Sequence, residues 1–131
     1  MKKLDLGTIG VGYEVLASDN GAAAFRTPLA TGHAFNGWYD AFLATPASGL
    51  EDLYIFASTT LPCGAVAKIY GHRFTQEVGG QDLGDEVDAV LSKKLSDHVS
   101  ILAKYSHFNA KAPTAATDGD KFWFQTEIKT R

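Results

Sequence analysis

The sequence has few of the features that mark disulfide-bonded, helical membrane or nucleic-acid-binding proteins. Its one cysteine, Cys63, excludes an internal disulfide bond. No apolar stretch approaches the roughly 18 residues that a transmembrane helix requires. The net charge of −3, without a cluster of Lys or Arg, gives no reason to expect nucleic acid as a partner. Ordinary hydrophobic (45%) and charged (21%) contents indicate one folded unit of 131 residues.

Patterns that mark catalysis or metal binding are also missing. The histidines His33, His72, His98 and His107 are scattered without the spacing of metal ligands, and Cys63 stands alone. The glycines near the N-terminus do not match a dinucleotide-binding fingerprint, and no nucleophile-elbow motif occurs. We therefore expect no catalytic residues, no metal and no cofactor.

Six segments alternate apolar and polar residues with the period of two that is typical of β-strands. The connections around Pro62–Gly64 and Ser96–Asp97 are tight, whereas Ala17–Glu51, Glu77–Gly84 and Asn109–Asp120 are longer. This order predicts an all-β, antiparallel up-and-down meander with every tight turn at one end. The six segments are Leu4–Leu16, Asp52–Leu61, Gly64–Gln76, Asp85–Leu95, His98–Phe108 and Lys121–Lys129.

Each strand has one apolar face and one polar face, which fits two classes of protein. A transmembrane β-barrel turns the apolar face toward lipid. A soluble, lipocalin-like barrel that binds a small apolar ligand turns the same face inward. Most of the segments are near or above the 9–11 residues of a tilted membrane strand, which favours the membrane. A surface module that contacts a partner through its long loops is a third alternative. The side chains of Val11, Leu91, Ile101 and Phe124 separate the first two.

The long connection Ala17–Glu51 has the most distinctive composition. Phe35, Trp38, Tyr39 and Phe42 recur at spacings of three and four residues. This spacing predicts a short amphipathic helix over residues 34–43.

Six blocks of the sequence are distinctive: Tyr13–Gly21, Phe25–Thr31, His33–Trp38, Gly49–Tyr54, Asp88–Lys94 and Asp120–Trp123. In this order, and over nearly the whole chain, these blocks resemble the C-terminal part of alginate-export-type outer-membrane proteins. The resemblance implies a monomeric barrel of about eighteen strands in the bacterial outer membrane, of which this chain would supply the last six. It also implies an electropositive pore that passes anionic sugar polymers or related solutes.

Three observations predict that the chain is a fragment of such a barrel, with the remaining strands missing. Six strands are fewer than the roughly eight of the smallest single-chain bacterial barrels. The start, Met1–Gly7, has no apolar signal-peptide core. The end, Ile128–Arg131, departs from the final aromatic residue common in outer-membrane barrels, so either this end is not the natural one or the assembly machinery recognises the barrel differently.

The predicted mechanism is passive diffusion through a polar lumen whose charged side chains select solutes by sign. We expect Arg26 and the loop aromatics Phe35, Trp38 and Tyr39 to line or plug the entrance. The alternative for the strand charges is ordinary solvation, and the alternative for the aromatics is a small core within their own loop. The predicted lining residues of the strands are Lys68, Glu86, Asp88, Lys94, Lys104 and Lys121.

Overall fold

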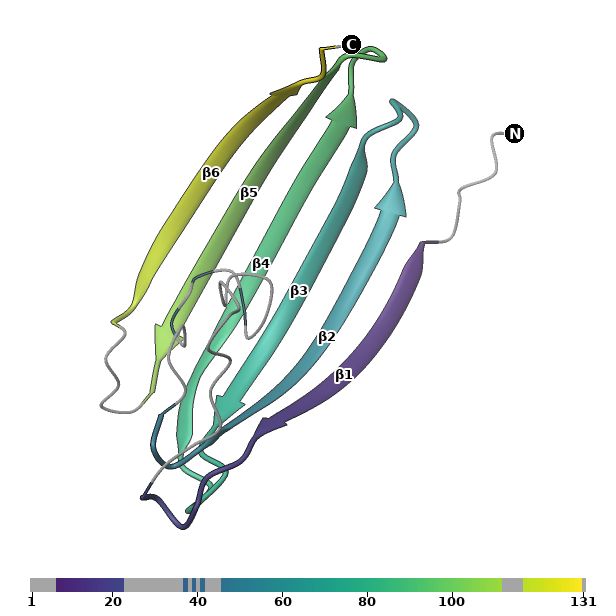
Figure 1. Ribbon diagram of the computed structural model, residues 1–131. Coiled ribbons are helices and arrows are strands. Elements are labelled where there is room, and N and C mark those ends of the chain that lie inside the picture. The colour runs from purple at the N-terminus through teal and green to yellow at the C-terminus, as the bar shows by residue number, and fades with distance from the viewer. Residues whose placement is uncertain are drawn as a thin grey trace.

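The computed structural model describes residues 7–22, 37, 39, 41, 46–111 and 117–130. Within these residues the chain forms one six-stranded sheet and contains no helix. Each strand pairs antiparallel with its neighbours in the sequence, so the predicted up-and-down meander is confirmed (Figure 1). The strands are β1 (Thr8–Leu16), β2 (Leu50–Thr60), β3 (Val66–Thr75), β4 (Asp82–Lys94), β5 (Val99–Ala110) and β6 (Gly119–Ile128).

The sheet is open, with β1 and β6 at its two edges. Residues 61–65 join β2 to β3 and residues 95–98 join β4 to β5, both at the end of the sheet where β1 begins and β6 ends (Figure 1). We call this the tight-turn end. The three longer connections lie at the opposite, long-loop end, as the sequence predicts.

Several strands differ from the predicted ranges because pairing with a neighbour continues beyond the alternating pattern. β2 begins at Leu50, which pairs with Leu16 and is 1% exposed. β4 begins at Asp82, beyond a register shift opposite Phe74. The first residues predicted for β1, numbers 4–6, lie outside the described residues, as do most residues of the predicted helix.

One described residue of that predicted helix, Gly37, has a φ of 83°, a value that an α-helix does not contain. Gly37 also approaches the sheet closely. A Cβ atom there would lie 2.5 Å from a carboxylate oxygen of Glu86. Glycine therefore lets the backbone of this connection come down onto β4.

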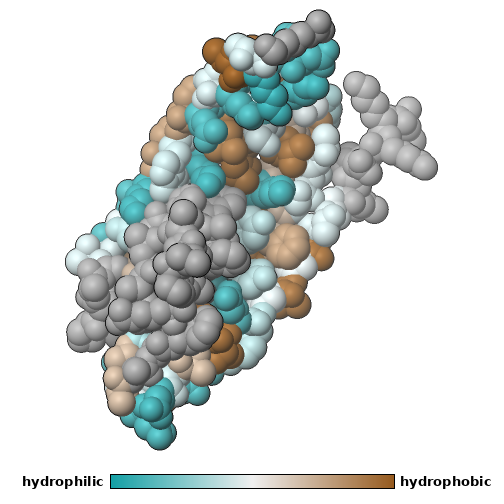
Figure 2. Space-filling view, viewed as in Figure 1, coloured by the Kyte–Doolittle hydropathy of each residue, from teal (hydrophilic) through white to brown (hydrophobic). Residues whose placement is uncertain are grey.

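The two faces of the sheet differ in burial. The first, which we call the exposed face, carries large apolar side chains in contact with solvent, including Ile9 (76%), Val11 (74%) and Phe124 (66%). The second, which we call the covered face, carries the small core at its long-loop end, where Tyr39 and Ala41 pack against it. Figure 2 views the covered face, on which hydrophilic and hydrophobic residues are intermixed. The core residues are Leu16, Leu50, Phe74, Leu83 and Phe108.

Two glycines of β1 make room for aromatic rings on the covered face. A Cβ atom on Gly10 would lie 2.4 Å from the ring of Phe56, and one on Gly12 would lie 2.2 Å from the ring of Tyr54. Both partners lie directly opposite in the register of β1 and β2. These glycines therefore allow close packing between β1 and the aromatic rings of β2, as their position within a strand indicates.

Candidate functional site

The exposed face carries a continuous apolar band that crosses all six strands. These side chains remain in contact with solvent, although burying one large apolar side chain lowers the free energy by about 1.5–3 kcal/mol. Such a contiguous surface marks contact with a partner or a membrane. One hydrogen-bonded row of the band contains Ile9, Ala57, Ile69, Ala89, Tyr105 and Phe122.

The band runs obliquely across the hydrogen-bonded rows. On β1 it extends from Ile9 to Val15, and on β6 from Phe122 to Ile128. Ile9 lies at the margin of the band that faces the tight-turn end. The hydrogen-bonded row that starts at Ile9 ends at Phe122, which lies at the opposite margin, facing the long-loop end. The band therefore shifts by its own length, roughly 20 Å, over five strand spacings of about 4.8 Å each. This slope corresponds to an inclination of roughly 40°, within a few degrees of the strand tilt of β-barrels.

Polar members of the exposed face gather at the margins of the band. Thr59 and Lys93 lie toward the tight-turn end, whereas Thr126 lies within the band, between Phe124 and Ile128. At the long-loop end a group of ion pairs begins where the apolar side chains stop. Arg73 lies 2.8 Å from Asp82.

The same group includes Lys111, which follows β5. Its Nζ atom lies 2.5 Å from Asp85 and 3.7 Å from Asp82. The hydrogen bond to Asp85 raises the pKa of Lys111 and burial lowers it, while the charges of Asp85 and Asp82 raise it and the charge of Arg73 lowers it. The margin is thus a layer of paired charges.

Two tyrosines stand at the long-loop margin of the band with their rings among apolar neighbours. The hydroxyl of Tyr13 donates to Glu51 at 2.9 Å, and that of Tyr105 donates to Asp120 at 2.5 Å. His107 also lies 2.8 Å from Asp120. Each carboxylate lies nearer the long-loop end than its tyrosine. Rings in an apolar layer with hydroxyls directed toward polar groups are typical of residues at a membrane–water interface.

The covered face holds a buried polar network that crosses four strands. His72 of β3 has its Nδ1 atom 2.9 Å from both carboxylate oxygens of Asp52 and its Nε2 atom 3.6 Å from Asp88. The hydroxyl of Ser106 is within hydrogen-bond distance of Asp88 and lies 2.9 Å from Glu86. Asp52, Glu86, Asp88 and Ser106 are each at most 1% exposed. Hydrogen bonds between them offset much of the cost of burial, although Oε2 of Glu86 has no hydrogen-bond partner among the described residues.

Tyr39, from the connection between β1 and β2, is held over this network. Its backbone N–H donates to Glu86 at 2.6 Å, and Lys121 donates to its carbonyl oxygen. Its ring stacks on Phe108 with the centroids 5.3 Å apart, and the ammonium of Lys121 lies 4.8 Å from the ring centre. Its hydroxyl donates to the carbonyl of Thr117 at 3.0 Å. Tyr39 thus joins the long connection to β4, β5 and β6.

A series of stacked rings runs along the covered face. Phe56 lies 5.5 Å from Tyr70, Tyr70 lies 6.1 Å from His72, and His72 lies 5.5 Å from Phe74, measured between ring centroids. Phe74 is fully buried, whereas Phe56 and Tyr70 are half-buried. The rings therefore lead from the core toward the tight-turn end, where they present aromatic surface.

The charged strand residues predicted to line a lumen differ in burial along the covered face, and Glu127 adds an exposed carboxylate at the tight-turn end. Toward the tight-turn end, Lys68 is exposed and Lys104 is half-buried, with its ammonium 5.9 Å from the ring centre of Trp123. Toward the long-loop end, the carboxylates of Glu86 and Asp88 are buried. Lys68 and Lys104 are therefore accessible to a solute, whereas the carboxyl groups of Glu86 and Asp88 are not.

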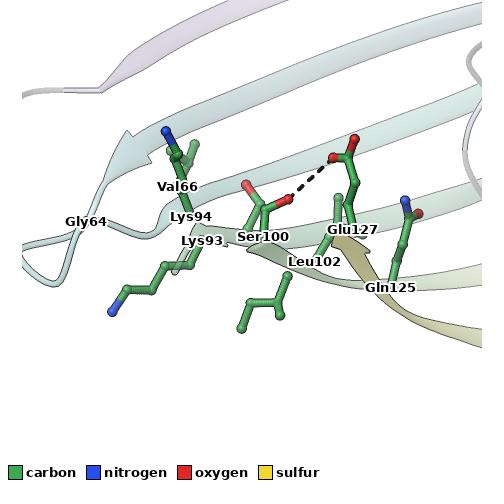
Figure 3. Close-up of a pocket in the computed structure, with 10 residues that line it drawn as sticks. Gly64, Val66, Lys93, Lys94, Ser100, Leu102, Gln125 and Glu127 are labelled. Atoms are coloured by element: carbon green, nitrogen blue, oxygen red, sulfur yellow. Dashed lines mark hydrogen bonds between the residues drawn. The ribbon is translucent and has the colours of Figure 1, made fainter. Parts of the chain in front are cut away.

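A groove of about 380 Å³ lies at the tight-turn end of the sheet (Figure 3). The hydroxyl of Ser100 lies 3.4 Å from Glu127 across it. Lys94 projects from the same side of the sheet as these two residues, whereas Lys93 points to the opposite side (Figure 3). The Nζ atom of Lys94 lies 3.0 Å from Asp97. Mixed charge therefore lines this groove.

The sequence-predicted lining residues of the strands all lie on the covered face, but in two different environments. Lys68, Lys94 and Lys104 are accessible. Glu86 and Asp88 are instead buried under hydrogen bonds. Lys121 is half-buried and contacts Tyr39. Of the predicted loop residues, Arg26, Phe35 and Trp38 lie outside the described residues, whereas Tyr39 lies on the covered face.

Sequence reasoning missed Asp52, His72 and Ser106 as members of the network. The spacing of the histidines does not single out His72, although alternation places it on the same face as Tyr70 and Phe74. The cross-strand register, in which His72 lies opposite Glu86 and Asp88 opposite Ser106, is the information that brings them together.

No helix in the described part of the chain is long and apolar enough to cross a membrane. The same residues contain no group of three or more His, Cys, Asp or Glu side chains placed to hold a metal ion. Comparison of the chain with protein-family models, with curated proteins and with solved structures found no match in any of the three.

Proposed function

We propose that this chain is a wall segment of an outer-membrane β-barrel through which anionic or sugar-type solutes diffuse passively. The oblique apolar band on the exposed face is the observation that carries the proposal. The resemblance of the sequence to alginate-export-type proteins points to the same class. In this proposal the exposed face meets lipid, the covered face lines the lumen, and further strands complete the wall.

The slope of the band has a direct physical reason in a bilayer. Strands of a membrane barrel are inclined by about 35–45° to the membrane normal. A flat hydrocarbon layer therefore intersects successive strands at different residues, and its limits cross the hydrogen-bonded rows obliquely. The shift from Ile9 to Phe122 within one row supports this geometry. In a soluble barrel of the lipocalin type the same side chains would be enclosed, but Val11 here is 74% exposed.

The charges of the covered face support an anionic or sugar-type solute. Accessible Lys68 and Lys104 attract anions, while the burial of Glu86 and Asp88 reduces the opposing attraction for cations. The half-buried ring of Tyr70 adds an apolar surface on which a sugar ring can pack.

The test uses the full chain refolded into phospholipid vesicles and then fused to a planar bilayer. We expect the protein to float with the vesicles and to form channels that pass chloride more readily than potassium. Lys68→Glu should lower the chloride-to-potassium permeability ratio severalfold. Lys93→Glu, which changes charge equally on the opposite face, serves as the matched control and should leave the ratio nearly unchanged.

Two results would contradict the proposal separately. A monodisperse soluble protein that ignores vesicles would remove the membrane wall altogether. Channels whose permeability ratio responds equally to the Lys68 and Lys93 substitutions would leave the wall in place but remove the assigned role of the covered face.

A further inference from the structure

We infer that the exposed face binds one phospholipid in a groove over β3, and that the headgroup of this lipid carries a phosphate and a primary ammonium. The inference rests on the proposed membrane location and names a lipid that this face would hold. The groove has a volume of about 350 Å³. Most of its lining belongs to β2, β3 and β4, each of which is paired on both sides by strands of this chain. The site therefore does not depend on what lies beside β1 and β6.

The groove exists because Gly71, in the middle of β3, has no side chain to place on the exposed face. The backbone at this glycine forms the floor. The walls are apolar side chains of the two neighbouring strands, and each of them is at least half exposed: Leu53 and Ile55 of β2 and Val87 of β4. The groove is therefore apolar and open to whatever lies against the exposed face.

Contacts among the described residues do not account for a glycine at position 71. Unlike a Cβ atom on Gly10 or Gly12, one on Gly71 would meet no ring. Its nearest contact, apart from the chain neighbours, would be a methyl carbon of Ile55 at an ordinary 3.6 Å. The φ of Gly71 is not positive, so the backbone would accept alanine. A glycine inside a strand weakens it and often marks the close approach of another backbone or of a ligand. No described backbone lies there, so we assign the space to a ligand.

The end of the groove nearest the long loops carries one charge of each sign. Arg73 and Asp85 both line the groove and lie directly opposite one another in the register of β3 and β4. Arg73 is paired with Asp82, and its side chain is still 61% exposed. Asp85 is paired with Lys111, and its side chain is still 40% exposed.

This pair of charges complements a zwitterionic headgroup. The guanidinium of Arg73 has further N–H donors in a geometry that suits a phosphate, and the carboxylate of Asp85 can accept from an ammonium. The two ion pairs together carry no net charge, because two cations face two carboxylates. A headgroup with both signs of charge therefore fits this end better than an anionic headgroup does.

The groove also has the polarity of a lipid within a bilayer. Its apolar floor lies next to Ile69, near the middle of the band, and its charged end lies at the long-loop margin. An acyl chain that packs on Gly71 would place its headgroup two residues further along β3, roughly 7 Å away, beside Arg73. Chain and headgroup of one phospholipid would thus meet the apolar and the charged parts of the groove at the same time.

The test measures, by native mass spectrometry, the phospholipid retained by the full chain in micelles of a non-ionic detergent. The probes are phosphatidylethanolamine and phosphatidylcholine with identical acyl chains. Both carry the phosphate, but the quaternary ammonium of choline has no N–H group to donate to Asp85. We expect the chain to bind phosphatidylethanolamine severalfold more tightly than phosphatidylcholine, and Asp85→Asn to remove most of this difference.

Substitutions at the floor test the groove itself. Gly71→Leu fills it and should lower the affinity for phosphatidylethanolamine severalfold. Ala103→Leu is the matched control, because it adds the same side chain to the exposed face of β5, outside the groove, and should leave the affinity unchanged. Gly71→Ala adds one methyl group that fits 3.6 Å from Ile55, so this variant should fold and bind with intermediate affinity.

Two results would overturn the inference. The first is equal binding of phosphatidylethanolamine by the unmodified chain and by both Gly71 variants. The second is equal affinity of the unmodified chain for the two lipids, since the headgroup would then play no part.

The outcome separates this inference from the proposed function. Protein that floats with vesicles and forms anion-selective channels, but shows either of these results, would keep the membrane wall and lose the lipid site. Protein that binds phosphatidylethanolamine over Gly71 but does not float would keep the lipid site and lose the wall.

Discussion

A lysine at the centre of the apolar band distinguishes lipid from water as the neighbour of the exposed face. Ile69 lies near the middle of the band and is 56% exposed, whereas Leu95, just beyond β4 at the tight-turn margin, is 55% exposed. In water the two positions are nearly equivalent, and each Lys substitution should change stability by about 0.5 kcal/mol, or by up to about 1 kcal/mol in a strand. In a bilayer, Lys costs about 2–4 kcal/mol at the midplane and about 0–1 kcal/mol near the interface.

Ile69→Lys should therefore destabilise the vesicle-bound protein by roughly 2–3 kcal/mol more than Leu95→Lys does, or 30- to 150-fold in the unfolding equilibrium constant. The assay is reversible unfolding by guanidinium in phospholipid vesicles, followed by tryptophan fluorescence. Thinner bilayers should reduce the difference, because they bring Ile69 closer to an interface. Equal destabilisation by the two substitutions would refute the reasoning, since exposure alone accounts for that result.

Three further predictions concern the covered face. Ser106→Ala removes the hydroxyl that joins two buried carboxylates and should lower the free energy of unfolding by about 1–3 kcal/mol, with Thr at this position restoring part of the loss. Gly12→Val places a Cβ atom 2.2 Å from the ring of Tyr54 and should lower the free energy of unfolding by about 1–3 kcal/mol. In a double-mutant cycle, the loss for Gly12→Val combined with Tyr54→Ala should be smaller than the sum of the two single losses. Lys121→Met removes the hydrogen bond to the Tyr39 carbonyl and the cation over the Tyr39 ring. Cleavage by chymotrypsin after Tyr39 should therefore accelerate severalfold. An unchanged cleavage rate would show that Lys121 does not hold Tyr39 in place.

Much of the sheet could be predicted from local patterns. Alternation correctly assigned Val11, Leu91, Ile101 and Phe124 to one face, because successive side chains in a strand point to opposite sides whatever the strand pairs with. The lengths of the connections correctly predicted antiparallel neighbours and the separation of tight turns from longer loops. Local patterns were weaker at strand ends, where Leu50 and Asp82 extend strands only because a partner is present.

The candidate site depends on contacts that no local pattern contains. Tyr39 stacks on Phe108, 69 residues away in the sequence, and its backbone N–H meets Glu86. Alternation predicts that Glu86 faces the same side as Lys68, but it does not indicate that Glu86 is buried while Lys68 is exposed. That difference follows from which segment lies over which half of the face.

The sequence by itself determined the strand order and the two faces of every strand, since both follow from a period of two and from the lengths of the connections. Only the tertiary structure decided the register between strands and the burial of the acidic network. Register depends on how turns and side chains of neighbouring strands fit together, and one step of two residues moves each row by about 7 Å along the strand. The oblique course of the apolar band is the sum of five such registers, and for that reason it becomes visible only when all six strands are paired.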